Sequence, residues 1–407
     1  MPDSHAAVGA PQSPLHGLRV IDVSRVISGP LCALLLGQLG AEVIRIEKPG
    51  GDISWAVPPF IGPDGTTHDQ ARAAGDISLG HAKRNFGKRS VELDITTESG
   101  RERFRGLALT ADVLVENFRP SVMPSLGLGH EELRSSNPSL IYCSITGYGH
   151  SGPYRDRHGM DLLVQAASGV MAMTGFPDGP PVKAGVYLGD HVPAVYAVVG
   201  ILAALRQRDR TKKGGFVDVS MHDVLTAMLW DAPLDVWQAE GRAERTGNTD
   251  PRGAPVNAYP TADGWIAILV MDDDRFRALC GEIGSPGLAD TCQGLRGRAL
   301  NAEVIDAAMT RWSSRLTTAS ALDRLVALDC PAAPVNPPWA GPSDPHTAAR
   351  GVLGYVAHHA APAPTAFRAA RLPIKFDTLA VSGDLTTEPL GFSTESFLGD
   401  RDARTTG

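Results

Sequence analysis

Apolar blocks alternate with turn residues near the start of the chain and predict a β–α–β unit. Residues 18–24 have the pattern of a buried strand, and residues 31–39 form a dense apolar helix. Pro30 suits the first turn of that helix, and Gly40 suits the left-handed position that ends one. A second strand follows at residues 42–47. Strands joined by a helix in this way lie parallel, so we expect a parallel sheet covered by helices.

The same alternation recurs further along the chain and extends the predicted sheet. Strands are predicted at residues 90–94, 113–116, 140–144 and 216–220, and helices at residues 98–108, 131–136, 192–206 and 222–239. Residues 168–188 have the composition of loops and short strands. The predicted fold class is therefore α/β, with a Rossmann-like parallel sheet in a large domain.

The second half of the chain predicts a smaller α+β domain. A strand at residues 265–270 precedes a helix at residues 275–283 and a mainly helical region. Turn residues are dense at 242–260, which is typical of a linker or an active-site loop, and short strands are expected near the C-terminus. The predicted division is a loose tail at 1–16, a large domain at 17–224, a small domain at 225–330, and a segment at 331–407 that returns to the large domain.

Composition and charge narrow the range of functions. The chain has 407 residues, of which 43% are hydrophobic and 20% are charged, as in a typical globular protein. The net charge of −7 and the pI near 5.9 argue against nucleic acid or an anionic membrane as a partner. The five cysteines are scattered without CxxC spacing, which is typical of reduced thiols. The first sixteen residues lack the features of a signal peptide, and the apolar stretch at 192–205 is too short to cross a bilayer, so we expect a cytoplasmic protein.

Asp190 is the leading candidate for a reactive group. It follows Gly189, directly before the predicted apolar helix at residues 192–206. Two interpretations are open at this point. An aspartate here can cap the helix by accepting backbone N–H bonds, and Pro193 would suit the first turn. A helix start also stabilises negative charge, and a carboxylate beside a glycine that lets a ligand approach can act as a nucleophile.

Basic residues near predicted strand ends indicate a place for phosphates. Ligands of open α/β sheets bind beyond the carboxyl ends of the strands, where the turn at residues 24–30 lies. Asn117 and Phe118 follow another strand, where an amide and a ring can flank a planar base. Seven cations fall in this part of the chain, namely Arg45, Lys48, Lys83, Arg84, Lys88, Arg89 and Arg119. They suit phosphate binding, or they belong to a solvated surface.

Several common signatures are missing from the sequence. There is no GxGxxG fingerprint of a dinucleotide site and no GxSxG turn of an α/β-hydrolase. His158 has no second His or Cys at metal-ligand spacing, so no metal site is expected.

Three motifs follow one another along the chain. They are Val115-Glu-Asn-Phe-Arg-Pro120 with Leu126-Gly127, then Ile145-Thr-Gly-Tyr-Gly-His-Ser-Gly-Pro153, then Gly189-Asp190. Together they resemble the class III CoA-transferase family of the CaiB/BaiF type, which includes formyl-CoA and carnitine CoA-transferases and α-methylacyl-CoA racemases. The resemblance runs from about Leu15 to the C-terminus and includes segments at residues 257–265 and 331–334.

This resemblance implies an enzyme that moves coenzyme A from an acyl-CoA donor to a carboxylic acid. The family's nucleophile falls on Asp190, which would form an aspartyl-acyl anhydride and then an aspartyl-CoA thioester. The chemistry needs N–H donors for an oxyanion, which we expect from the helix start. The resemblance also implies interlocked homodimers, with coenzyme A and acyl-CoA as substrates and no permanently bound cofactor. The family's CoA-contact positions fall on Ile27, Ser28, Lys48, Leu93, Ile95, Thr96, Asn117, Phe118, Arg119, Ser125, Leu126, His158, Met160 and Asp161.

Met160 favours the transferase branch over the racemase branch. In the racemases a histidine stands thirty residues before the aspartate, and a methionine at this position cannot carry a proton. Ser125 replaces an arginine of the formyl-CoA transferases, and their run of glycines is absent between Gly247 and Tyr259. Exchange between formyl-CoA and oxalate is therefore not expected. Racemase-like α-proton chemistry and CoA-ligand binding without catalysis remain as alternatives.

Overall fold

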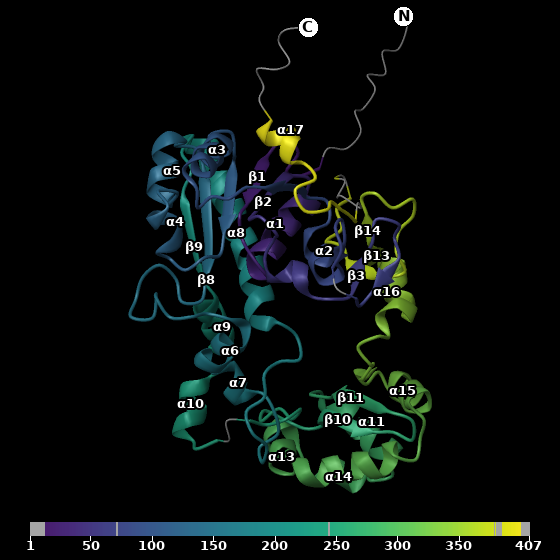
Figure 1. The fold of residues 1–407 in the computed structure, drawn as a ribbon. Helices are drawn as coiled ribbons and strands as arrows, with labels where there is room; N and C mark the ends of the chain where they lie inside the picture. The colour runs from purple at the N-terminus through teal and green to yellow at the C-terminus, as the bar shows by residue number, and fades with distance from the viewer. Residues whose placement is uncertain (1–12, 71, 243–244, 378, 380–384, 400–407) are drawn as a thin grey trace, which may run out of the picture. The chain divides into compact units, whose positions relative to one another are not determined.

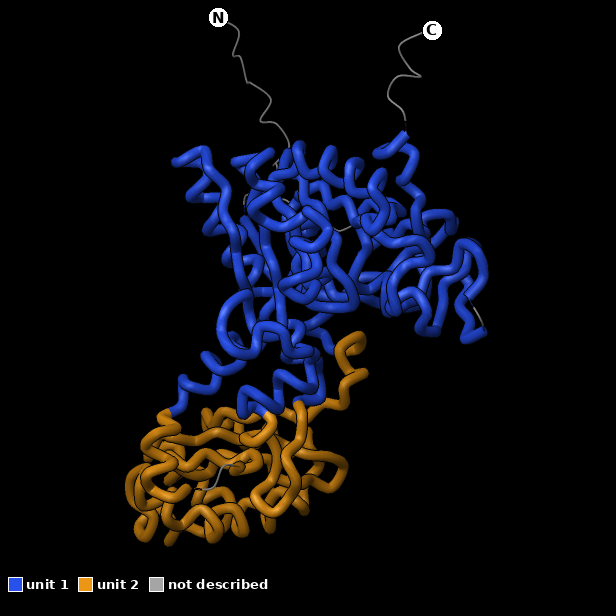
Figure 2. The backbone as a smooth tube through the Cα atoms, turned by 60° about the vertical axis from the view of Figure 1, so that its left-hand side comes forward, with its two compact units in different colours: residues 1–170, 184–232, 344–407 blue, residues 171–183, 233–343 orange. Residues whose placement is uncertain are grey.

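The computed structural model describes residues 13–70, 72–242, 245–377, 379 and 385–399. The chain divides into two compact units, which Figure 2 colours separately. Unit 1 comprises residues 1–170, 184–232 and 344–407, and unit 2 comprises residues 171–183 and 233–343. The C-terminal segment therefore belongs to the same unit as the N-terminal half of the chain.

Unit 1 is built on a six-stranded sheet in which every strand pairing is parallel (Figure 1). In spatial order the strands are β6 (Arg89–Glu92), β2 (Glu42–Glu47), β1 (Arg19–Asp22), β7 (Val113–Glu116), β8 (Ile141–Thr146) and β9 (Phe216–Ser220). The predicted parallel α/β sheet is confirmed. Successive residues of a strand face opposite sides, so Val20 packs into one core cluster and Ile21 into another.

Helices cover both faces of this sheet. One core cluster takes apolar residues from α1 (Ser28–Gln38) and α8 (Leu188–Thr211), and the other takes them from α3 (Glu98–Ala108) and α5 (His130–Ser136). The remaining short helices of unit 1 are η1 (Ile53–Ala56), α2 (Leu79–Asn85), α4 (Val122–Ser125), α6 (Asp161–Ser168), α9 (Met221–Leu229), α16 (Pro345–Arg350) and α17 (Thr394–Leu398). The helix predicted at residues 222–239 is interrupted after Leu229, because Pro233 disfavours a helical conformation in the residue before it.

Helix α8 is longer than the sequence indicated and begins earlier, at Leu188. With 24 residues and a mean hydropathy of 1.6 over its most apolar window, it is long and apolar enough to cross a membrane by those two measures alone. The prediction that this stretch is too short for that is therefore wrong. Ala194, Ala197 and Ile201 on one side of α8 are fully buried in the core cluster against the sheet, whereas 39% of the whole apolar window is buried.

Several short elements had no clear signal in the sequence. A small antiparallel sheet of β3 (Phe60–Ile61), β4 (Thr67–His68) and β5 (Ile77–Ser78) precedes α2. Strands of two residues are too short to show an alternating pattern. Short strands predicted near the C-terminus are present, as β13 (Leu353–Tyr355) with β15 (Arg368–Ala370) and β14 (Ala357–His358) with β16 (Thr386–Thr387). Residues 168–188, where short strands were expected, contain α7 (Val170–Met173) and turns instead.

Unit 2 contains a three-stranded antiparallel sheet and a set of helices. The strands are β10 (Val256–Pro260), β11 (Trp265–Leu269) and β12 (Ala332–Pro334), in that spatial order. The helices are α10 (Leu234–Ala239), α11 (Asp273–Glu282), α12 (Gly287–Thr291), α13 (Gly294–Leu300), α14 (Ala302–Ser313), α15 (Thr318–Ala327) and η2 (Gly341–Ser343). Buried Ile266, Phe276 and Ile305 join the sheet to these helices in one core.

Candidate active site

A cavity of about 240 Å³ opens at the carboxyl ends of the parallel strands in unit 1. The segments after β1, β2, β6 and β7 line it, as expected for a ligand site of an open α/β sheet. Five of the predicted contact residues line this cavity, namely Lys48, Leu93, Ile95, Thr96 and Phe118. Arg25 and Asp52 also line it, and neither was singled out in the sequence.

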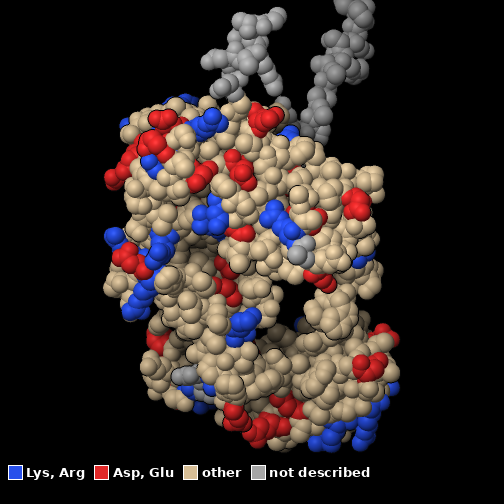
Figure 3. All heavy atoms as spheres, viewed as in Figure 1, with Lys and Arg blue, Asp and Glu red and all other residues tan. Residues whose placement is uncertain are grey.

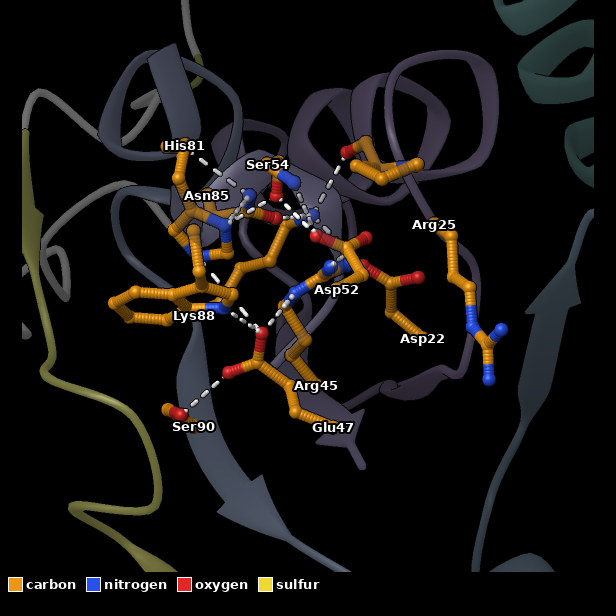
Figure 4. Close-up of polar contacts among 12 residues, drawn as sticks. Asp22, Arg25, Arg45, Glu47, Asp52, Ser54, His81, Asn85, Lys88 and Ser90 are labelled. Carbon is orange, nitrogen blue, oxygen red and sulfur yellow. Dashed lines mark hydrogen bonds and ion pairs between the residues drawn. The ribbon is translucent and has the colours of Figure 1, made fainter. Parts of the chain in front are cut away.

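A buried ion network adjoins the cavity, because Arg45, Glu47 and Asp52 belong to both, and Figure 4 shows its polar contacts. Asp22 accepts from Lys88 at 2.8 Å and from Arg45 at 3.0 Å, and Arg45 also contacts Glu47 at 3.1 Å. Lys88 donates further to the carbonyl of Pro30 and to Asn85, both at 2.8 Å. All three donors of this ammonium group are thus used. Burial lowers the pKa of Lys88 to about 8, although Asp22 opposes that shift.

Neither interpretation of the basic residues, as phosphate ligands or as a solvated surface, holds for Arg45 and Lys88. Arg45 and Lys88 are buried and paired, so neither is free for a phosphate, whereas Arg89 is exposed and contacts Glu388 at 3.0 Å through one nitrogen. On the face shown in Figure 3, acidic and basic side chains are interspersed over the surface.

Three other cations remain available near the cavity. Arg25, Lys48 and Arg119 have no ion pair within the part of the chain that the structure describes. The guanidinium of Arg25 lies 4.7 Å from the centre of the Phe118 ring, and partial burial lowers the pKa of Arg25. A cation stacked on an aromatic ring can meet both a phosphate and a planar base.

Asp190 occupies the third position of α8 and does not cap the helix. The cap comes instead from Asp161, whose Oδ1 accepts the N–H of Gly189 at 2.7 Å. Gln165 donates to both oxygens of Asp161, at 3.0 and 2.9 Å, and accepts the N–H of Ala184 at 2.9 Å. The carboxylate of Asp190 forms no hydrogen bond with any residue that the structure describes. The capping interpretation of Asp190 is therefore wrong, and its oxygens are free to react.

The surroundings of Asp190 make its carboxylate unusually basic. Partial burial raises the pKa of Asp190 to about 6, the charge of Asp161 adds to this rise, and Arg84 opposes it. Arg84, at the end of α2, is half-buried and has no ion pair or hydrogen bond among the described side chains. A carboxylate of raised pKa is a stronger nucleophile and is still mostly ionised at neutral pH.

The start of α8 does not offer the N–H donors that the sequence suggested. The N–H of Gly189 bonds to Asp161, and those of Asp190 and His191 bond to the carbonyl of Tyr187 at 3.2 and 2.9 Å. These groups are therefore not free for an oxyanion. Pro193 lies inside the helix rather than in its first turn, and its missing N–H leaves the carbonyl of Gly189 without its helical partner.

Gly189 allows close contact between α6 and α8. A Cβ atom there would lie 2.7 Å from Cγ2 of Val164 and 3.1 Å from the carbonyl oxygen of Asp161. Any larger residue would push the first turn of α8 away from its cap.

The remaining predicted contact residues lie outside the cavity lining. Ile27 and Ser28 are buried in the turn before α1 and at its start, and Asn117 donates to Oγ of Ser28 at 3.2 Å. Ser125 bonds to a carbonyl of its own short helix, and Leu126 packs against the core. His158 and Met160 are exposed, Met160 by 64%, on the loop that leads to Asp161. Among the described residues there is no group of three or more His, Cys, Asp or Glu that could hold a metal ion.

Comparisons with known proteins agree on one family. The model of CoA-transferase family III matches residues 15–391. A succinate–glutarate CoA-transferase of Agrobacterium fabrum is 38% identical, over 83% of this chain and 84% of its own. An acetyl-CoA:oxalate CoA-transferase of Acetobacter aceti is 39% identical, over 84% and 86%. The crystal structure of a CaiB/BaiF family protein from Brucella suis superposes with a TM-score of 0.82 at 32% identity, over 95% of this chain and 98% of that one.

Proposed function

The chain belongs to CoA-transferase family III, and we propose that it transfers coenzyme A to a carboxylic acid through covalent intermediates on Asp190. It is a CoA-transferase by its family, and the mechanism is the part proposed here. The observation that carries the mechanism is the free, half-buried carboxylate of Asp190, whose pKa is raised to about 6.

In the first half of the reaction, the Asp190 carboxylate attacks the carbonyl carbon of the acyl-CoA thioester. The C–O bond of a mixed anhydride forms, the C–S bond breaks, and coenzyme A leaves as the thiolate. The thiolate then attacks the aspartyl carbonyl, which gives an aspartyl-CoA thioester and releases the donor acid. The acceptor acid repeats these steps in reverse. Partial burial of Asp190 favours this route, because water would hydrolyse the anhydride.

The cavity at the strand ends supports a place for the nucleotide part of coenzyme A. Arg25 and Lys48 supply unpaired cations for the phosphates, and Phe118 supplies a ring for the base. Because Lys88 and Arg45 are already paired, the phosphates would depend on these exposed cations.

Small carboxylic acids, among them dicarboxylic acids, are the proposed acyl partners. The relatives are named for succinate, glutarate and oxalate, so oxalate belongs in any substrate screen despite the missing glycine run. Arg84 supports an anionic substrate, because it is an unpaired cation close enough to Asp190 to influence its pKa.

A homodimer is proposed as well, and the outer side of α8 supports it. Val195, Val199 and Leu202 recur at helical spacing on this side and are exposed, Val199 by 59%. An apolar stripe of this kind on a soluble domain is typical of a surface that a partner covers.

A screen of acyl-CoA donors against carboxylic acids tests the proposed function. We expect exchange with at least one pair and an enzyme-bound thioester that hydroxylamine or borohydride traps at Asp190. Asp190→Ala should abolish both, whereas Asp209→Ala, at an exposed position of the same helix, should abolish neither. Unchanged exchange by Asp190→Ala would refute the nucleophile assignment. Exchange of the substrate α-proton with deuterium, without CoA transfer, would favour the racemase alternative.

A further inference from the structure

The turn that joins β1 to α1 contains a backbone conformation that its side chain disfavours. Val26 has a φ of 65°, a positive value that among described non-glycine residues is shared only by Lys212 and Asp329. Those two residues follow the ends of α8 and α15, where left-handed residues are common. Val26 instead follows Arg25 at the cavity. A β-branched residue disfavours this region by roughly tenfold or more in the equilibrium between backbone conformations.

Packing of the Val26 side chain does not account for this conformation, because the residue is 44% exposed. Two polar side chains from other segments hold the turn instead. Asn117 accepts the N–H of Arg25 at 2.7 Å and donates to the carbonyl of Arg25 at 2.8 Å. Asp52 accepts the N–H of Val26 at 3.0 Å. The peptide groups on both sides of Arg25, including the one that leads into Val26, are therefore held from outside the turn.

Asp52 is itself fixed by the buried ion network (Figure 4). Its Oδ1 accepts the N–H of Ser54 at 2.8 Å, and Nη2 of Arg45 lies 3.6 Å from its Oδ2. Arg45 is held in turn by Asp22 at 3.0 Å. Buried ion networks add little to stability compared with apolar packing. The network instead holds Oδ2 of Asp52 at a fixed position, where it accepts the N–H of Val26.

We propose that Asp52 is a positioning residue for coenzyme A, because it holds residues 24–28 in the strained conformation that sets Arg25 at the cavity. In this conformation the Arg25 guanidinium lies over Phe118 and is free to meet a phosphate. Without Asp52, Val26 relaxes toward negative φ and Arg25 leaves this position. The inference rests on the proposed function, since it takes coenzyme A as the ligand.

A double-substitution cycle measured by CoA binding tests the role of Asp52. Glycine adopts positive φ without strain, so in Val26→Gly the turn no longer needs Asp52 to hold it in this conformation. Titration calorimetry of the full chain with coenzyme A should show that Asp52→Ala weakens binding about tenfold in the Val26 protein and less than about threefold in the Val26→Gly background. Asp64→Ala is a matched control. Asp64 accepts the N–H of the residue two positions on, Thr66, at 2.9 Å, as Asp52 does with Ser54, but Asp64 is not among the residues that line the cavity.

The possible outcomes separate this inference from the proposed function. An equal loss of affinity in both backgrounds would overturn it, because Asp52 would then act on coenzyme A directly or on the unit as a whole. Full affinity in Asp52→Ala would overturn it as well. If circular dichroism shows that Asp52→Ala does not fold, Asp52→Leu, which also lacks an acceptor, carries the same comparison. A wild-type chain that binds no coenzyme A would refute the proposed function instead.

Discussion

Asp190 lies where its negative charge is unfavourable, so removal of the charge should stabilise the folded chain. Burial, and then the charge of Asp161, raises its pKa from 3.8 to about 6. Below pH 3.8 the carboxyl is protonated in both the folded and the unfolded chain. As the pH rises toward 6 only the unfolded chain ionises, so stability falls across this window and the loss is complete above pH 6. The shift corresponds to about 3 kcal/mol, or about 2 kcal/mol after allowance for partial exposure.

Asp190→Asn removes this charge and keeps the shape of the side chain. It should raise the free energy of unfolding by about 2 kcal/mol near pH 7.5 and leave it almost unchanged near pH 4. Urea unfolding followed by circular dichroism measures the difference, with Asp209→Asn on the exposed side of the same helix as the control. Equal stability of Asp190→Asn and wild type near pH 7.5, or an equal gain near pH 4, would refute this view of the site.

Three further predictions follow from the same contacts. Arg84→Met should raise the pKa of Asp190 and so move the acid limb of the kcat/KM profile against pH to higher pH. Asp161→Asn should lower the pKa of Asp190 and move that limb to lower pH. An unchanged profile in both variants would contradict the influence of these two charges on Asp190. Lys48→Ala should raise KM for acyl-CoA about tenfold with little change in kcat, and the effect should shrink at high salt; a change confined to kcat would count against a phosphate contact. Val199→Asp should convert the proposed dimer to monomers in analytical ultracentrifugation, and an unchanged mass would count against α8 as the interface.

The parallel sheet could be predicted because its strands and helices have strong local patterns. Residues 18–47 combine apolar runs with a proline and a glycine at the ends of the helix, and these signals agree with each other. The start of α8 could not be predicted in the same way. Its cap is Asp161, which stands far away in the sequence, so nothing beside Leu188 marks the first turn.

The ion pairs of Lys88 and Arg45 and the strained backbone of Val26 could not be predicted from the sequence either. Lys88 and Arg45 are cations near strand ends, as a phosphate site requires, but their partners include Asp22 of β1 and Asn85 of α2, which lie far from them or in another element. A valine in a left-handed conformation contradicts its own propensity, so no local pattern indicates Val26. Departures from local rules of this kind are expected at functional sites, where the surrounding structure imposes them.

The most direct test of the account follows the oxygen atoms of the acceptor acid. In the proposed mechanism one carboxylate oxygen of the acceptor becomes the bridging oxygen of the anhydride and stays on Asp190 when coenzyme A leaves with the new acyl group. An acceptor acid labelled with a heavy oxygen isotope should therefore place one labelled oxygen in the peptide that contains Asp190, as mass spectrometry of the digested enzyme would show. Productive turnover with no label in that peptide would contradict a covalent role for Asp190.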